Sequence, residues 1–84
     1  MSDWPYYESH KVVQAMKIVE RRVSRDTEDW VLENGDVIER VKSDLIMRVP
    51  KSVQPVGGYV VRYADGFESW SPAKAFEEGY TRRQ

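Results

Sequence analysis

The chain has 84 residues and a mass of 9.9 kDa, which corresponds to one small domain. It contains no cysteine, which excludes disulfides and thiolate chemistry, and 13 Lys and Arg against 14 Asp and Glu leave a net charge of −1. This balance argues against binding to long nucleic acid or to a membrane surface, and the short apolar runs predict neither a membrane span nor a signal peptide.

Residues 1–10 are predicted to form an aromatic arm in front of a single domain over residues 11–84. Pro5 disfavours the helical region for Trp4, and two further rings, Tyr6 and Tyr7, follow closely. We expect this arm to lack regular structure. With three rings it either folds back onto the domain or docks on a partner.

Residues 11–24 fit two patterns. Four valines and one isoleucine favour a long strand. No capping box opens the segment and no glycine closes it, as a helix would require. The strand is the preferred interpretation. The helix stays open as an alternative because four apolar residues also recur at helical spacing: Val12, Met16, Val19 and Val23.

The first of two predicted hairpins turns at Asn34-Gly35. Asn-Gly is the strongest short hairpin signal because both residues tolerate the positive φ of a type I′ turn. A two-residue loop would pair Leu32 with Val37 and Val31 with Ile38.

The second half of the chain predicts a helical turn over residues 43–49, which Pro50 ends. A second hairpin joins residues 59–63 to 67–70 through a turn at residues 64–66. Ser71 is then a predicted N-cap and Pro72 the first helical residue, with Gly79 as the C-cap. Residues 81–84 are expected to fray.

Together these elements predict an α+β fold, namely a small antiparallel sheet or half-open barrel of about five strands with a short C-terminal helix. Large rings are expected to build the core of so small a domain. The rings assigned to the core are Trp30, Tyr59, Trp70 and Phe76.

Catalytic or metal-binding patterns are missing from the sequence. The single histidine, His10, has no partners at the spacing of a metal site or a catalytic triad. Gly57-Gly58 lacks the Lys and Ser/Thr that a phosphate-binding loop requires. We therefore expect no enzyme, no cofactor and no metal ion.

Aromatic rings beside arginines form the most informative pattern. Such groups can contact a protein or stack on a base and grip its phosphates. The arginines Arg21, Arg22 and Arg25 form a second cluster, which nearby carboxylates are expected to neutralise in part. The predicted partner-binding residues are Trp4, Tyr6, Tyr7, Arg62, Tyr63 and Arg82.

Residues 56–82 resemble a segment of small accessory proteins from tailed bacteriophages and prophages. The motifs that carry this resemblance are Gly58-Tyr59, Asp65-Gly66-Phe67, Ser71-Pro72, Phe76-Glu77 and Gly79-Tyr80. The start of the chain, from His10 to Ile18, is loosely similar, whereas residues 21–55 depart from the pattern. The resemblance implies a phage protein in the host cytoplasm, and it implies no activity.

These observations lead to one expected function and three alternatives. The expected function is a non-enzymatic binding protein that inhibits a host defence factor through protein–protein contact. The first alternative is a sponge that sequesters a nucleotide signal. The others are a virion component whose exposed hairpin edges pair between copies, giving a homo-oligomer, and a small barrel that binds single-stranded nucleic acid.

Overall fold

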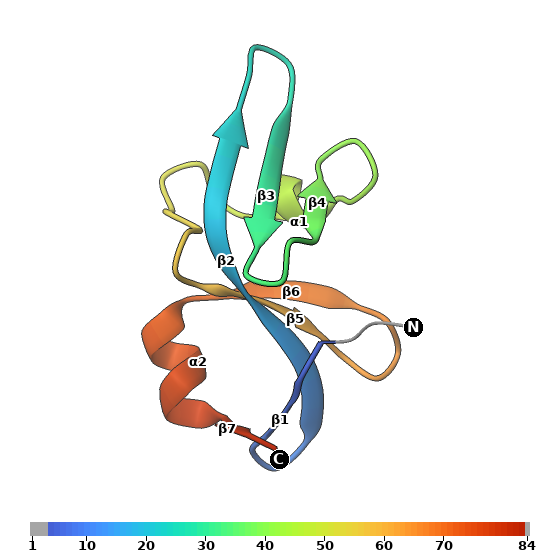
Figure 1. Cartoon of the computed structure of the whole chain (residues 1–84), viewed down its shortest axis with the longest axis vertical. Coiled ribbons are helices and arrows are strands. Elements are labelled where there is room, and N and C mark those ends of the chain that lie inside the picture. The colour runs from blue at the N-terminus through green and yellow to red at the C-terminus, as the bar shows by residue number, and fades with distance from the viewer. Residues whose placement is uncertain (1–3, 84) are drawn as a thin grey trace.

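The computed structural model describes residues 4–83, which form an open, mainly antiparallel sheet with two short helices (Figure 1). The α+β class is as expected, but the described residues form seven strands rather than about five. No helix within residues 4–83 is long and apolar enough to cross a membrane. In chain order the elements are β1 (Tyr6–Glu8), β2 (Val12–Val23), β3 (Glu28–Leu32), β4 (Val37–Glu39), α1 (Leu45–Arg48), β5 (Tyr59–Arg62), β6 (Glu68–Ser71), α2 (Ala73–Gly79) and β7 (Thr81–Arg82).

The long strand β2 is the axis of the sheet. In its first half, Gln14 pairs with Tyr6 of β1 on one edge and with Arg62 of β5 on the other. The second half pairs with β3, and a β-bulge between Ile18 and Glu20 shifts the register there. A bulge bends and twists its strand, so one strand serves both parts of the sheet. The predicted strand is therefore confirmed, and the helical alternative is wrong.

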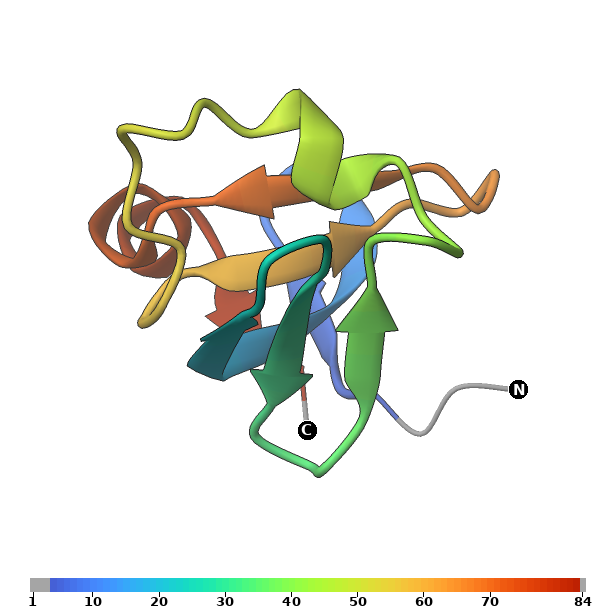
Figure 2. The same cartoon turned by 90° about the horizontal axis from the view of Figure 1, so that it is seen from above.

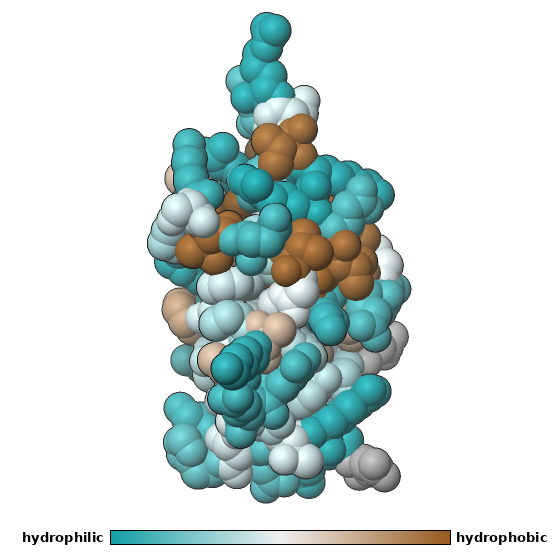
Figure 3. Space-filling model, turned by 90° about the vertical axis from the view of Figure 1, so that its left-hand side faces the viewer, coloured by the Kyte–Doolittle hydropathy of each residue, from teal (hydrophilic) through white to brown (hydrophobic). Residues whose placement is uncertain are grey.

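The tip of the β2–β3 hairpin projects from the body of the molecule. Residues 19–27 are all exposed, and Figure 3 shows the tip as a narrow, largely hydrophilic projection. Two of its arginines are paired within the hairpin, Arg21 with Glu28 at 2.8 Å and Arg22 with Glu20 at 3.3 Å. Carboxylates of the same hairpin thus neutralise part of the arginine cluster.

The β3–β4 hairpin turns at Gly35, but the predicted two-residue turn is wrong. The Leu32 N–H donates to the Asp36 carbonyl at 2.8 Å, and the Gly35 N–H donates to the Leu32 carbonyl at 2.9 Å. The loop therefore has three residues and ends with Gly35 at a φ of +94°, as in a type I turn followed by a left-handed residue. Val31, rather than Leu32, consequently lies opposite Val37.

Burial explains this register. The observed register places Trp30 opposite Ile38. Trp30, Leu32 and Ile38 all belong to the same hydrophobic core or pack against it. In the predicted register Ile38 would lie opposite Val31. It would then point to the other face of the sheet, because side chains alternate along a strand. Burying the three apolar side chains together outweighs the local preference of Asn-Gly.

Two hydrophobic cores lie on the two faces of the β2–β5 layer. Along β5, Val60 belongs to the first core, whereas Tyr59 and Val61 belong to the second. Helix α1 packs on the first core and α2 on the second, and both views show the helices well apart (Figures 1 and 2). The first core consists of Trp4, Met16, Ile18, Trp30, Leu32, Leu45, Ile46 and Val60, and the second of Val13, Ala15, Tyr59, Val61 and Phe76. Of the four predicted core rings, Trp30, Tyr59 and Phe76 are buried and Trp70 is half-buried.

Both ends of the described chain are more ordered than expected. Residues 6–8 form β1 and residues 81–82 form β7, and these two strands pair with each other. Residues 6–8 are thus a strand rather than part of an arm without regular structure, and Thr81 and Arg82 are not frayed. Residues 1–3 of the predicted arm and residue 84 of the predicted frayed end lie outside the described residues. The physical reason is that β1 also completes one edge of β2, so both ends gain backbone hydrogen bonds that isolated tails would lack.

The caps predicted for the C-terminal helix are also corrected. Ser71 is the last residue of β6 and pairs with Tyr59, so Pro72 takes the N-cap position. Gly79 is the last helical residue, and its φ is not positive. The predicted turn before Pro50 is confirmed as α1, where the Ser43 hydroxyl accepts a hydrogen bond from the Leu45 N–H at 3.2 Å.

Candidate binding surface and basic pocket

An exposed aromatic surface lies where the start of β2 meets the β5–β6 turn. Its two most exposed rings are Tyr6, which is 51% exposed, and Phe67, which is 53% exposed. Two adjoining open hollows, of about 530 and 400 Å³, share Val12 and Tyr63 in their walls. We call the following residues the aromatic surface: Tyr6, Lys11, Val12, Tyr63 and Phe67.

The β5–β6 turn holds two of these rings in place. The Tyr63 N–H donates to the Phe67 carbonyl at 2.9 Å, and Gly66 closes the three-residue loop with a φ of +90°. The Asp65 carboxylate also accepts a hydrogen bond from the Phe67 N–H at 2.9 Å. The two ring centroids are 6.1 Å apart as a result. The rings are therefore presented by a fixed turn rather than by a loose loop.

Cations lie over both rings. The Lys11 ammonium is 5.7 Å from the centre of the Tyr63 ring, and the Arg48 guanidinium is 4.9 Å from that of Phe67. Burial raises the pKa of the Tyr63 hydroxyl, so this group stays protonated and can donate a hydrogen bond near neutral pH. The surface thus offers apolar area, a hydroxyl donor and positive charge together.

Trp4 and Arg62 are placed together by the structure, but inside the fold. Trp4 is buried in the first core, and its indole N–H donates to the Asp36 carboxylate at 2.8 Å. The Arg62 guanidinium lies 4.0 Å from the Trp4 ring centre and donates twice to one oxygen of Glu68, at 2.9 and 2.8 Å. Both residues are therefore engaged in closing the core, although Arg62 still lines one hollow of the aromatic surface.

Tyr7 and Arg82 do not join the aromatic surface. Tyr7 packs edge-on against Phe76 at 4.8 Å between ring centroids, and burial raises the pKa of its hydroxyl. Arg82 lies opposite Tyr7 in the β1–β7 pair, and both line a separate hollow that also includes Tyr59 and Glu33. Of the six predicted binding residues, Tyr6, Arg62 and Tyr63 therefore share one hollow of the aromatic surface, whereas Tyr7 and Arg82 share the separate one.

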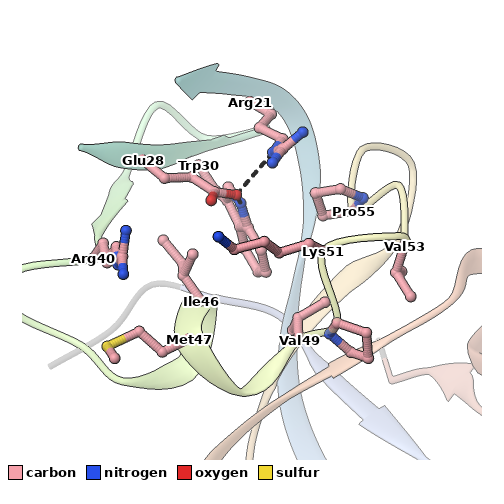
Figure 4. Close-up of a pocket in the computed structure, with 11 residues that line it drawn as sticks. Arg21, Glu28, Trp30, Arg40, Ile46, Met47, Val49, Lys51, Val53 and Pro55 are labelled. Atoms are coloured by element: carbon pink, nitrogen blue, oxygen red, sulfur yellow. Dashed lines mark hydrogen bonds and ion pairs between the residues drawn. The ribbon is translucent and has the colours of Figure 1, made fainter. Parts of the chain in front are cut away.

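The sequence reasoning missed a basic pocket of about 110 Å³ on another face (Figure 4). Its floor includes the buried side chains of Trp30 and Ile46. Three cations from separate parts of the chain lie around it, namely Arg21 of β2, Arg40 after β4 and Lys51 after α1. Only the tertiary structure brings these three together.

Phe67 of the aromatic surface, by contrast, could have been predicted from sequence as an exposed ring, because it is a large aromatic residue directly after a polar turn.

One carboxylate, that of Glu28, also lines the basic pocket. It accepts hydrogen bonds from Arg21 Nε at 2.8 Å and from the Trp30 indole N–H at 3.0 Å. The hydrogen bond from Arg21 is the main reason that the pKa of Glu28 is lowered, and the charge of Arg40 lowers it further. Glu28 therefore stays ionised and is satisfied by its own neighbours.

The described part of the chain contains no cluster of metal-binding side chains. No group of three or more His, Asp or Glu within residues 4–83 could hold a metal ion. His10 is exposed, and its Nδ1 lies 3.4 Å from the hydroxyl of Ser9. No protein-family model, curated protein or solved structure matches the chain. The aromatic surface and the basic pocket are therefore the features of this chain that bear on its function.

Proposed function

We propose that this chain is a small non-enzymatic binding protein whose aromatic surface docks on a protein partner. The observation that carries the proposal is the pair of exposed rings, Tyr6 and Phe67, held on paired strands and a hydrogen-bonded turn. Aromatic side chains supply much of the binding energy at protein interfaces because they bury a large area at a low cost in entropy. In the phage setting that the resemblance implies, the partner is a host factor, with a defence protein as the first candidate.

The chemistry of the aromatic surface indicates what the partner presents. The two hollows are wide and open, so they suit protruding side chains better than a small molecule, which would bind in an enclosed site. Lys11 takes part in no salt bridge among residues 4–83, and its ammonium lies over the face of Tyr63. The matching partner surface carries apolar side chains with a carboxylate beside them.

A nucleotide is a weaker fit to this surface. Gripping its phosphate would require a free arginine next to the rings, but Arg62 is held by Glu68 and stacked on Trp4. Arg48, which lies over Phe67, is paired with Asp44. Arg82 lies in a different hollow. Single-stranded nucleic acid would need a track of free cations, and Lys11 beside an already paired Arg48 does not form one.

The edges of the sheet favour a monomer over a virion component. Strand β7 has two residues and β4 has three, and the outer edge of β6 is partly capped because Arg48 donates to the Glu68 carbonyl. Short, capped edges resist pairing with further copies. We therefore propose protein contact with a host factor ahead of self-assembly.

The test compares two double variants of a tagged chain in phage-challenge assays and in capture from infected host lysate. Tyr6→Ser with Phe67→Ser removes both exposed rings. Val23→Ser with Val41→Ser removes two exposed apolar side chains elsewhere, of which Val23 is 61% and Val41 75% exposed. Loss of two central interface rings should cost about 2 kcal/mol or more, a roughly 30-fold weaker complex.

The proposal expects the ring variant to lose both the captured protein and protection of the phage, while the control variant retains both. Near-UV circular dichroism confirms that the two variants are folded. Equal capture by the two variants would contradict the proposed surface. Turnover of a substrate by the purified chain would contradict the proposed function itself.

A further inference from the structure

The basic pocket carries an inference that is independent of the aromatic surface. It lies between the β2–β3–β4 sheet, α1 and the loop after α1, and Figure 4 shows side chains from all of these converging on it. Its buried floor, Trp30 and Ile46, is 1% and 5% exposed. An apolar floor keeps water away from one side of any bound group and strengthens its electrostatic contacts.

The basic pocket has more positive charge than its salt bridges neutralise. Arg21 is paired with Glu28, which leaves those two neutral as a pair. Neither Arg40 nor Lys51 takes part in an ion pair among residues 4–83, and Figure 4 shows Lys51 extending across the pocket from the wall opposite Arg40. Two cations that form no salt bridge therefore line one small cavity, and of these Arg40 also acts on the charge of Glu28. Arg21 adds its terminal N–H groups, since its bond to Glu28 uses Nε.

We infer that the basic pocket binds the terminal phosphate of a small phosphate monoester through Arg21, Arg40 and Lys51. The charge count favours a phosphate over a carboxylate, because a phosphate monoester carries between −1.5 and −2 near neutral pH, about the charge of Arg40 and Lys51 together. Arginine is also the residue best suited to hold two phosphate oxygens at once.

The size of the pocket suits a phosphoryl group. Its volume of about 110 Å³ is several times the roughly 10–15 Å³ that one water molecule requires in a cavity. At the rim, Met47, 64% exposed, and Val53 offer apolar contact to the organic part of the ligand.

Calorimetric titration of the full chain tests this site with four probes: inorganic phosphate, adenosine 5′-monophosphate, adenosine and acetate. The two phosphate-bearing probes should bind with saturation, and the monophosphate should bind more tightly if the rim contacts the organic part. Adenosine and acetate should not bind. Saturating binding of adenosine alone would overturn the assignment of phosphate as the recognised group.

Two charge-matched variants locate the site. Arg40→Gln with Lys51→Gln should weaken binding by at least about tenfold, the effect of losing one charge-assisted hydrogen bond. Arg25→Gln with Lys74→Gln removes the same charge from exposed positions outside the pocket and should leave binding unchanged. Equal weakening in both variants would show that binding depends only on the overall charge of the chain, and it would contradict the proposed site. Absence of phosphate binding to the wild-type chain would contradict it as well.

The two proposals can fail separately. The variant that lacks Tyr6 and Phe67 should bind adenosine 5′-monophosphate as the wild-type chain does, because neither ring lines the basic pocket. Loss of phosphate binding in that variant would contradict the placement of the site between β3 and α1.

Discussion

Gly58 shows how tightly one residue can be constrained at the start of β5. A Cβ at this position would lie 2.6 Å from the Trp70 indole nitrogen and 2.7 Å from the Ser71 carbonyl oxygen. The backbone of Gly58 also accepts a hydrogen bond from the Ile18 N–H at 2.8 Å, so it cannot easily move away. The close approach of β6 therefore requires glycine here.

Gly58→Ala should destabilise the fold by about 2 kcal/mol, because overpacking of this kind costs 1–3 kcal/mol. Urea unfolding measures the change in free energy. Gly79→Ala is the matched control: nothing lies within 4 Å of a Cβ there, and the residue is helical. It should be neutral or stabilising by up to about 1 kcal/mol. A neutral Gly58→Ala would contradict the proposed contact.

Glu28 predicts a pH dependence of stability. Hydrogen bonds from Arg21 and Trp30 lower its pKa below the ordinary value of 4.5. A carboxyl whose pKa is lowered by folding stabilises the folded state above the ordinary value, and this contribution is lost as the pH falls through the lowered pKa. Stability should therefore decline below about pH 4.5, in the range where Glu28 becomes protonated.

Glu28→Gln should cost about 1 kcal/mol at pH 7 and should flatten this decline. Chemical denaturation at pH 7 and at a series of acidic values gives both quantities. Glu20→Gln is the control, since the Glu20 side chain is 53% exposed in its pair with Arg22. A decline that is equally steep in the two variants would contradict the role assigned to Glu28.

At the scale of elements, β1 closes the sheet at one end of the molecule. It pairs with β2 and β7, and Trp4 just before it fills the first core. The Ala15 N–H also donates to the Pro5 carbonyl at 3.1 Å. A segment read from sequence as an arm is thus an integral strand of the domain.

Deleting residues 4–9 should destabilise the chain by more than about 3 kcal/mol, because removal of a buried tryptophan alone costs that much. Thermal unfolding followed by circular dichroism measures the loss. Tyr6→Ser alone, which changes an exposed side chain of β1, should shift the midpoint little. A truncated chain that melts cooperatively at the original temperature would contradict the structural role of β1.

At the scale of the whole molecule, two cores share one layer of sheet. Strands β2 and β5 contribute side chains to both cores, so neither core can form without the strands that the other needs. All three tryptophans belong to the first core or pack against it, whereas Phe76 anchors α2 in the second. The domain should therefore unfold in one cooperative transition.

Phe76→Ala should cost about 3–5 kcal/mol and should shift the transition seen by tryptophan fluorescence as much as the one seen by far-UV circular dichroism. Lys74→Gln, an exposed change in α2, should shift neither. Fluorescence that stays at the wild-type midpoint while the circular dichroism moves would show that the two cores unfold independently.

Local sequence determined most of the secondary structure. The valine-rich run forms β2, and Asp65-Gly66 forms the turn of the second hairpin. Pro50 follows the end of α1, and Pro72 precedes the start of α2. These predictions held because each signal acts within a few residues. The same signals failed where burial competed with them. The register at Gly35 followed the needs of Trp30 and Ile38 rather than the preference of Asn-Gly.

Tertiary structure alone decided which candidate binding residues reach the surface. Sequence marked Trp4 and Arg62 as a ring and a cation, but only folding showed that they stack on each other over the first core. It likewise brought Arg21, Arg40 and Lys51 around one pocket. The physical reason is that a side chain's role depends on what covers it, and the residues that cover it come from distant parts of the chain.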